Sequence, residues 1–308
     1  MLRSFQNKGL EHVVLCPGSR SSPLALAVGG LVEGFGLNLY TSIDERSAAF
    51  LALGISAASG KAALVITTSG TAVANLLPAA VEADRSCHPI IFITADRPLR
   101  LKGCGANQTV NQEDFLKSVC RGFVQAPCEG IHTLGINKIP ILVKEVWEKA
   151  HQNPGPVHFN IPFEEPLHAS YSEQKETWDE IGNEVLINNN LENKIVSSLS
   201  KKEDVFFPDL DPNDVGIIVA GPWRGRAMDL EKFRTSLKIF QSLTNWPIFA
   251  DPLSGVLSDQ PGLINYWELL LSSGKLDFGN HLQILRLGPI SSSRVLEVFL
   301  RNFPEKQV

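Results

Sequence analysis

Hydrophobic and polar positions alternate in blocks along the chain. Short, nearly continuous apolar runs in the first half predict buried strands at 12–16, 37–42, 62–68, 89–95 and 156–162. The longer segments between them predict helices at 45–60, 70–86 and 133–155. Pro78 should break the second of these helices, and the sequence "NPGP" should end the third. Strands that alternate with helices in this way predict a doubly wound α/β domain with a parallel sheet.

A polar segment separates this block from a second one. Residues 166–190, rich in Ser, Glu and Asn, predict a linker over the surface. The α/β alternation then returns, with predicted strands at 214–221, 246–251 and 281–288 and predicted helices at 190–200, 227–245 and 292–302. We therefore expect one α/β domain at 1–165, a linker at 166–190 and a second parallel-sheet domain at 191–308.

Both ends of the pattern are short for a doubly wound fold. About a dozen residues precede the first predicted strand, and no strand follows the last predicted helix. A doubly wound domain usually continues such a helix into another strand. The pattern predicts a truncated chain with an incomplete second domain.

Composition narrows the class of protein. The 308 residues are 44% hydrophobic and 20% charged, which is typical of a globular protein with a sizeable core. A net charge of −5 argues against a general nucleic-acid surface. The five cysteines include no C-x-x-C pair, which favours reduced thiols over a disulfide framework or a zinc site. Without a signal-peptide core or an apolar run of membrane-spanning length, the sequence predicts a cytoplasmic protein with no membrane partner.

Polar residues follow the first three predicted strands. Ser19 and Arg20 come after the first strand, where the start of the next helix favours anions. Glu45 comes after the second, and the turn of Thr68, Ser69 and Gly70 after the third. Each position also has a structural explanation: a surface charge beside a serine cap, an acidic first helical turn, and an ordinary polar turn. The residues alone leave both explanations open.

The loop after the fourth strand is the richest in candidate chemistry. It carries Arg97, Asn107 and Gln108 in a span without apolar periodicity. Guanidinium groups suit carboxylates because they offer a planar fork of donors. Since cationic residues follow both the first and the fourth strand, the pattern favours a small polyanionic substrate. The chain contains no P-loop and no G-x-G-x-x-G fingerprint, which counts against a plain dinucleotide-binding protein.

Taken together, "PGSRSSPL", "DERSAAFLALG", "TSGTAVANLLPA" and "TADRP" followed by "GANQT" resemble the MenD family of thiamine-diphosphate-dependent synthases. The resemblance implies decarboxylation of 2-oxoglutarate and addition of the succinyl group to isochorismate, in menaquinone or phylloquinone biosynthesis. It also implies a homo-oligomer, dimer or tetramer, with each active site between two subunits. The chain would then comprise a pyrimidine-binding domain and an incomplete Rossmann-like middle domain.

The resemblance assigns roles to particular residues. Glu45 is expected to be catalytic, as a desolvated carboxyl that hydrogen-bonds the pyrimidine ring of thiamine diphosphate. Thr68, Ser69 and Gly70 are expected to bind the cofactor with it. The expected substrate-binding residues are Ser19, Arg20, Arg97, Asn107, Gln108 and Arg294. Ser293 stands where some family members have a lysine, so one cationic contact is missing from the pattern.

One departure from the family pattern concerns the metal. The family holds diphosphate and Mg²⁺ with a Gly-Asp-Gly segment, which this sequence does not contain. We assign no metal ligand in the chain, expect the Mg²⁺ and diphosphate site on a further domain, and expect the chain alone to be inactive. Two alternatives stay open: another thiamine-diphosphate-dependent 2-oxo acid lyase, and a non-catalytic α/β module derived from such an enzyme.

Overall fold

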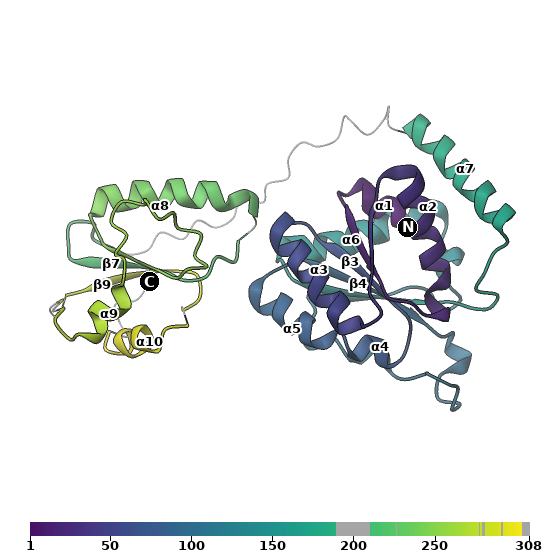
Figure 1. Cartoon of the computed structure of the whole chain (residues 1–308), viewed down its shortest axis with the longest axis horizontal. Helices are drawn as coiled ribbons and strands as arrows, with labels where there is room; N and C mark the ends of the chain where they lie inside the picture. Colours follow the sequence, from purple (N-terminus) through teal and green to yellow (C-terminus); the bar gives the residue numbers. More distant parts are fainter. Residues whose placement is uncertain (189–209, 226, 277, 279–280, 291, 304–308) are drawn as a thin grey trace. The chain divides into compact units, whose positions relative to one another are not determined.

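The chain forms two α/β units, Met1–Ser197 and Ser198–Val308, in a computed structural model (Figure 1). The structure describes residues 1–188, 210–225, 227–276, 278, 281–290 and 292–303. Both units contain a parallel sheet with helices on its two faces, which confirms the predicted fold class. Within these described ranges, no helix combines the length and the apolar character needed to cross a membrane.

The first unit is built on a six-stranded parallel sheet in the order β2-β1-β3-β4-β6-β5. Its strands are β1 (His12–Leu15), β2 (Asn38–Thr41), β3 (Ala63–Thr67), β4 (Ile90–Asp96), β5 (Gly122–Gln125) and β6 (Pro156–Pro162). Every residue of β3, β4 and β6 is buried, as expected for central strands covered on both faces. The five predicted strands are confirmed. Strand β5 was not predicted, because its four residues include a glycine and a glutamine and show no apolar run.

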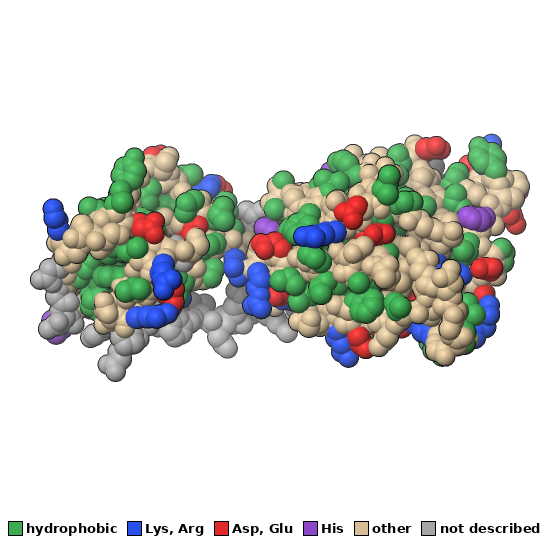
Figure 2. Space-filling view, turned by 60° about the horizontal axis from the view of Figure 1, so that its bottom comes forward, with side chains coloured by type: hydrophobic (Ala, Val, Ile, Leu, Met, Phe, Trp, Pro, Cys, Tyr) green, Lys and Arg blue, Asp and Glu red, His purple; other side chains and the backbone are tan. Residues whose placement is uncertain are grey.

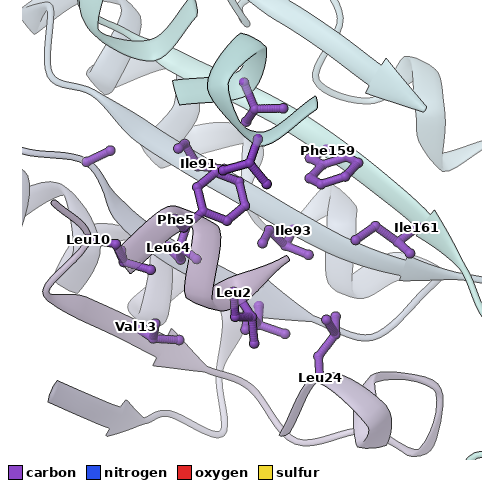
Figure 3. Packing of buried hydrophobic residues seen from close by; sticks show 14 of the residues in the cluster. Leu2, Phe5, Leu10, Val13, Leu24, Leu64, Ile91, Ile93, Phe159 and Ile161 are labelled. Atoms are coloured by element: carbon purple, nitrogen blue, oxygen red, sulfur yellow. The ribbon is translucent and has the colours of Figure 1, made fainter. Parts of the chain in front are cut away.

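Helices cover both faces of this sheet. One face is covered by α1 (Leu2–Asn7), α2 (Ser22–Phe35) and α6 (Ile139–Gln152), and the other by α3 (Glu45–Ser59), α4 (Thr71–Ala74) and α5 (Leu77–Ser86). Figure 3 shows the first of these interfaces, where Phe5 of α1 reaches the cluster that contains Ile91 and Phe159. Phe5 is fully buried there. Because each face of the sheet is covered, the carboxyl edge of the strands is left to carry polar groups.

The helix boundaries follow local signals. Asp44 caps α3, since its Oδ2 accepts a hydrogen bond from the Ser47 amide at 2.9 Å. The predicted break at Pro78 is confirmed, because α4 ends at Ala74 and α5 begins at Leu77, one residue before the proline. Helix α6 ends at Gln152, directly before the predicted stop.

The polar segment after β6 contains a helix, α7 (Tyr171–Asn188), where the sequence predicted a linker. Its start is a capping box: the Ser170 amide donates to Glu173 Oε2 at 2.7 Å, and the Glu173 amide donates to Ser170 Oγ at 3.4 Å. Trp178 packs against α2 at Gly30, where a Cβ would lie 2.3 Å from the indole Nε1. The polar composition of this segment concealed one anchoring aromatic residue.

The second unit has a three-stranded parallel sheet in the order β8-β7-β9. Its strands are β7 (Gly216–Ala220), β8 (Ile248–Ala250) and β9 (Gln283–Leu287), and all three were predicted. Helix α8 (Leu230–Thr244) packs on one face, and α9 (Trp267–Ser272) and α10 (Arg294–Arg301) pack on the other. The short α9 was not predicted. The predicted helix at 190–200 lies outside the described residues.

Candidate active site at the carboxyl edge of the sheet

Neighbouring strands β1 and β3 send their following helices to opposite faces of the first sheet. Helix α2, after β1, packs on one face, and α4, after β3, packs on the other. Such a switch point opens a crevice at the carboxyl edge, which is where open α/β sheets bind ligands. The turns predicted to carry chemistry after β1 and β3 therefore lie at the position where this fold favours a site.

Arg20 lies in the short 3₁₀ helix Ser19–Ser21 at this crevice and is only 8% exposed. One terminal nitrogen, NH1, donates to the Phe163 carbonyl at 3.0 Å, and the other, NH2, donates to Glu165 Oε1 at 3.3 Å. Its buried Nε has no hydrogen-bond partner among the described residues. The neighbouring Ser19 is exposed. Arg20 is thus held in place by residues that follow β6, and its Nε–H donor has no partner among the described residues.

Arg97 lies directly after β4 and reaches the turn after β3. Its NH1 donates to Ser69 Oγ and to the Gln108 carbonyl, the latter at 2.9 Å. Burial lowers the pKa of Arg97, and the positive charge of Arg20 lowers it further. Two guanidinium groups within electrostatic reach of each other favour a bound anion, because an anion relieves their repulsion.

Gly70 and Gln108 approach each other closely beside Arg97. Gly70 has φ +84°, and a Cβ there would lie 2.8 Å from Gln108 Cγ. Gln108 itself has a positive φ of 57°, and its Nε2 donates to the Ser69 carbonyl at 3.1 Å. Glycine is required at position 70 for both reasons. The predicted cofactor turn and the predicted substrate loop are therefore in direct contact, while Asn107 is exposed beside them.

The turns after β1 and β3 also touch. Thr68 is 8% exposed, and a Cβ on Gly18 would lie 2.4 Å from Thr68 Cβ. No side chain fits between these two turns without moving one of the strands. The position of Arg20 is thus fixed relative to that of Ser69.

A buried amide network, which we define as Asp96, Lys102, Gln112 and Asn160, lies under the loop. Gln112 Oε1 accepts from the Gly70 amide at 2.9 Å, and its Nε2 donates to Asn160 Oδ1 at 2.8 Å. Asn160 Nδ2 and Lys102 Nζ donate to Asp96 Oδ2, at 2.7 and 2.6 Å. Burial lowers the pKa of Lys102, but hydrogen bonds to Asp96 and Glu113 outweigh it and raise the pKa overall. The network ties the loop that carries Arg97 and Gln108 to the sheet.

None of the four residues of this network was assigned a role from the sequence. Asn160 could have been singled out from the sequence, because it is a polar residue within the apolar run of β6. His158, in the same strand, had the same signal: it hydrogen-bonds Thr94 Oγ1 at 2.7 Å, and burial lowers its pKa to about 4. Gln112 had no local signal, since its contacts come from distant segments.

Glu45 occupies a different environment. It is the first residue of α3, is only partly buried, and its Oε2 accepts a hydrogen bond from Asn75 Nδ2 at 3.1 Å. A desolvated carboxyl was expected here, and the described part of this chain does not enclose it. A cavity of about 160 Å³ opens beside the preceding turn, lined by Leu15, Pro17, Thr41, Ser42 and Ile43.

Exposed apolar side chains lie on both sides of Glu45 in the sequence, beside the exposed Asp44 and Arg46. We name the exposed side chains of Tyr40, Ile43, Phe50 and Leu51 the apolar rim; their exposed fractions are 38, 89, 41 and 42%. Figure 2 shows, on one face of the molecule, further hydrophobic side chains among charged ones. Exposed apolar side chains that gather on a surface are typical of a region that another polypeptide or a ligand covers.

These residues suit one end of the implied cofactor. A carboxylate at a helix start, with a small and largely apolar cavity beside it, fits an aminopyrimidine ring, which has polar edges and apolar faces. The other end requires oxygen ligands for Mg²⁺. Across the described ranges, no three His, Cys, Asp or Glu side chains lie close enough together to hold a metal ion.

Arg294 lies in the second unit, at the exposed start of α10. Ser293 caps this helix by accepting from the Leu296 amide at 3.2 Å, and its Oγ donates to Glu268 Oε1 at 2.5 Å. An open hollow of about 400 Å³ is lined in part by Arg294 and Arg301. The substrate-binding role of Arg294 stays a prediction.

Comparison with known proteins gives a consistent result. Residues 1–117 match the family model of the thiamine pyrophosphate enzyme N-terminal TPP binding domain. The chain is 61% identical over 310 residues to a 2-succinyl-5-enolpyruvyl-6-hydroxy-3-cyclohexene-1-carboxylate synthase of Prochlorococcus marinus, covering 100% of this chain and 54% of that protein. A protein of the same name from a Synechococcus species is 51% identical over 301 residues, which cover 98% of this chain and 51% of that protein. The chain thus spans about half the length of the curated relatives that it matches.

Proposed function

The chain belongs to the 2-succinyl-5-enolpyruvyl-6-hydroxy-3-cyclohexene-1-carboxylate synthase family, and from this premise we propose that it supplies the pyrimidine-binding and carboxylate-binding parts of an enzyme that joins 2-oxoglutarate to isochorismate. The observation that carries the proposal is the pair of guanidinium groups, Arg20 and Arg97, at the switch point of the sheet. Both proposed substrates are dicarboxylates, which is the chemistry that paired arginines recognise.

The arginine cluster, which we define as Arg20, Ser69, Arg97 and Gln108, would bind and orient substrate carboxylates. Arg20 offers its unpartnered Nε, and Arg97 is fixed by Ser69 and by the Gln108 carbonyl. A guanidinium held by hydrogen bonds before the ligand arrives loses little side-chain freedom on binding. Ser19 and Asn107, exposed at the edge of the cluster, are proposed as further hydroxyl and amide contacts.

Glu45 would hold and move a proton at a pyrimidine ring nitrogen. Thiamine diphosphate, when bound, supplies a carbon nucleophile and an electron sink for decarboxylation. Asn75 orients the Glu45 carboxyl through Oε2, at the start of α3. A positioned carboxyl at this point acts as a general acid and base. We propose Thr68, Ser69 and Gly70 as the neighbouring turn that contacts the cofactor.

A second copy of the chain is the proposed cover for Glu45. The apolar rim extends from β2 through the turn before α3 to the middle of α3, on both sides of Glu45 in the sequence. We propose that a partner that buries the rim also removes water from the carboxyl. Loss of water raises the pKa of a carboxyl and makes it a better proton donor. We therefore propose a homo-oligomer in which the site is completed between subunits.

The metal and the compartment are also proposals. Because the sequence contains no Gly-Asp-Gly segment, we assign no residue of this chain to Mg²⁺ or to the diphosphate, and propose that both are held elsewhere in the enzyme. The five cysteines are free thiols, which supports a reducing compartment such as the cytoplasm.

The proposal is tested with two proteins. One is the 308-residue chain alone, and the other is the joined protein, in which this chain is fused to the remaining half of the relative that is 61% identical to it. Each is supplied with thiamine diphosphate, Mg²⁺, 2-oxoglutarate and isochorismate, and carbon dioxide and the condensed product are measured. We expect turnover by the joined protein only, with both substrates required.

Three other outcomes of these assays would contradict parts of the proposal. Turnover by the chain alone would contradict the assignment of the diphosphate site to another part of the enzyme. Carbon dioxide released with other 2-oxo acids and without isochorismate would favour a different thiamine-diphosphate-dependent lyase. An inactive joined protein, beside an active intact relative as the control, would favour a non-catalytic module.

A further inference from the structure

Two consecutive glutamates follow β6 and pair with two arginines at the carboxyl edge of the sheet. Glu165 Oε1 accepts from Arg20 at 3.3 Å. Glu164 accepts from Arg100 through both oxygens, at 2.6 and 3.1 Å. One of these arginines belongs to the arginine cluster, and the other lies outside it.

The pair of Arg20 and Glu165 is unequal in burial. The Arg20 side chain is 9% exposed, whereas the Glu165 side chain is 69% exposed. Arg20 is also held by the Phe163 carbonyl at 3.0 Å, through a different nitrogen. The arginine therefore has a second anchor, and the exposed Glu165 carboxylate can turn into water when another acceptor takes its place on Arg20.

The carboxylate of Glu165 is the same chemical group that the proposed substrates would bring to Arg20. From this geometry we infer that Glu165 is an internal counter-ion, which occupies Arg20 until a substrate carboxylate displaces it. The inference rests on the proposed function, because it requires Arg20 to bind a carboxylate ligand. It adds a residue that sets how strongly the site holds its acidic substrates.

The exchange balances in charge. A bound carboxylate replaces Glu165 on Arg20, and Glu165 returns to solvent. Burial and the positive charge of Arg20 both lower the pKa of Arg97. The arginine cluster keeps an anionic partner both before and after the substrate carboxylate replaces Glu165. Without a carboxylate on Arg20, the charges of Arg20 and Arg97 would lose one of the negative charges that oppose them, leaving that of Asp96 beside Arg97, which is unfavourable.

The expected size of the effect follows from the exposure of Glu165. Ion pairs with an exposed partner are weak, so removing Glu165 as a competitor should tighten binding by about two- to fivefold. A residue that positioned Arg20 would have the opposite effect, since its removal would weaken binding. The sign of the change therefore distinguishes the two roles.

The experiment uses succinate, a plain dicarboxylate, as the probe. The 308-residue chain is titrated while the Arg20 Nε–H resonance is followed by NMR, because this buried nitrogen has no partner among the described residues and reports on a new contact. The resonance is assigned by its absence in Arg20→Lys. We expect the succinate Kd of Glu165→Gln to fall about two- to fivefold below that of the parent chain.

Glu164→Gln is the matched control. It removes one negative charge from the adjacent position, but its partner Arg100 is 64% exposed and lies outside the cluster. We expect a smaller change in Kd than for Glu165→Gln. In the Arg20→Lys background, where backbone amide resonances of the loop that carries Arg97 and Gln108 replace the missing Arg20 signal as the readout, the additional Glu165→Gln change should lose most of its effect. Both glutamates are exposed, and thermal unfolding followed by circular dichroism checks that the variants fold.

Two outcomes would contradict the inference, and they differ in what they say about the role of Arg20. If succinate moves the Arg20 resonance but Glu165→Gln binds equally or more weakly than the parent, the inference is wrong and the proposed role of Arg20 stands. If succinate moves the resonance in none of the variants, the carboxylate-binding role of Arg20 fails, and the inference fails with it.

Discussion

The arginine cluster and the surroundings of Glu45 lie at the same edge of one sheet but differ in how completely this chain builds them. Around Arg20 and Arg97, the chain supplies carbonyls, a hydroxyl and a buried amide network. Around Glu45, it supplies Asn75 and then an exposed apolar rim. One part of the site is organised before any ligand arrives, and the other is left open for a partner.

The two parts of the site should therefore depend on different processes, one on folding and the other on assembly. A preorganised subsite depends on folding, because its groups are fixed by contacts between distant segments. An open subsite depends on assembly, because its environment changes when a second polypeptide covers it. Mutations in the two regions should therefore affect different measurements, and the following predictions are ordered by the size of the expected effect.

The largest effect is expected for Glu45→Gln in the joined protein. Product formation should fall by about 10²- to 10⁴-fold, the usual contribution of a general acid or base. The midpoint of thermal unfolding should hardly change, because the contact with Asn75 lies at the surface. Glu33→Gln, an exposed acid on α2, is the control and should keep activity. A loss of less than tenfold at Glu45 would contradict the catalytic assignment.

Asp96→Ala should show the reverse pattern, with a direct loss of stability. It leaves Lys102 and the fully buried Asn160 without their shared acceptor, at a cost of about 3–4 kcal/mol in the free energy of unfolding. Urea denaturation of the 308-residue chain measures this. The control is Asp114→Ala, which breaks an exposed pair with Lys117 and should cost less than about 0.5 kcal/mol. Equal effects would show that the buried amide network does not hold the loop.

The region around the network should also lose stability in mild acid. Burial lowers the pKa of His158 to about 4, from its ordinary value of 6.5. The unfolded chain therefore takes up a proton on this residue below pH 6.5, while the folded chain stays neutral until near pH 4. The contribution is fully present above pH 6.5 and decreases by up to about 3 kcal/mol as the pH falls to 4. Urea denaturation at several pH values should show a flatter profile for His158→Gln, and an unchanged profile would contradict the prediction.

The smallest of these effects is expected for Gly18→Ala. The new methyl group would meet Thr68 Cβ at 2.4 Å and push apart the turns after β1 and β3, at a cost of about 1–3 kcal/mol. Gly29→Ala is the control: it lies within α2 with no atom in the way, so it should stabilise by about 0.5–1 kcal/mol. If Gly18→Ala is as stable as the parent chain, the two turns are not rigidly coupled.

Most of the sheet could be predicted because buried parallel strands are continuous apolar runs, as in β3, β4 and β6. Strand β5 could not, because its position is set by pairing with β6 rather than by its own composition. Helix α7 was hidden for a related reason. Its polar sequence predicted a linker, although Ser170 and Glu173 form a capping box that is visible in the sequence.

The candidate site divides in the same way. Local order identifies Arg20, Glu45 and the Ser69 turn, since each directly follows a strand. Gln112 could not be found in this manner, because it reaches the site through a contact with a residue 42 positions away. Glu165 also follows a strand, but its partner Arg20 lies 145 positions away in the sequence, so no local pattern shows the pair. The alternating pattern of a strand encodes which face is buried, but it does not encode which distant amide will satisfy a buried donor.

The position of β6 has a consequence for synthesis on the ribosome. It is the last strand of its sheet to be translated, yet it pairs with β4 on one side and β5 on the other. A nascent chain that ends before residue 156 must keep this slot open, with Ile91 and Ile93 of β4 lacking their neighbour. Until β6 emerges, the growing polypeptide exposes an apolar strand edge of the kind that chaperones protect, and Arg20 lacks its carbonyl partner until Phe163 is made.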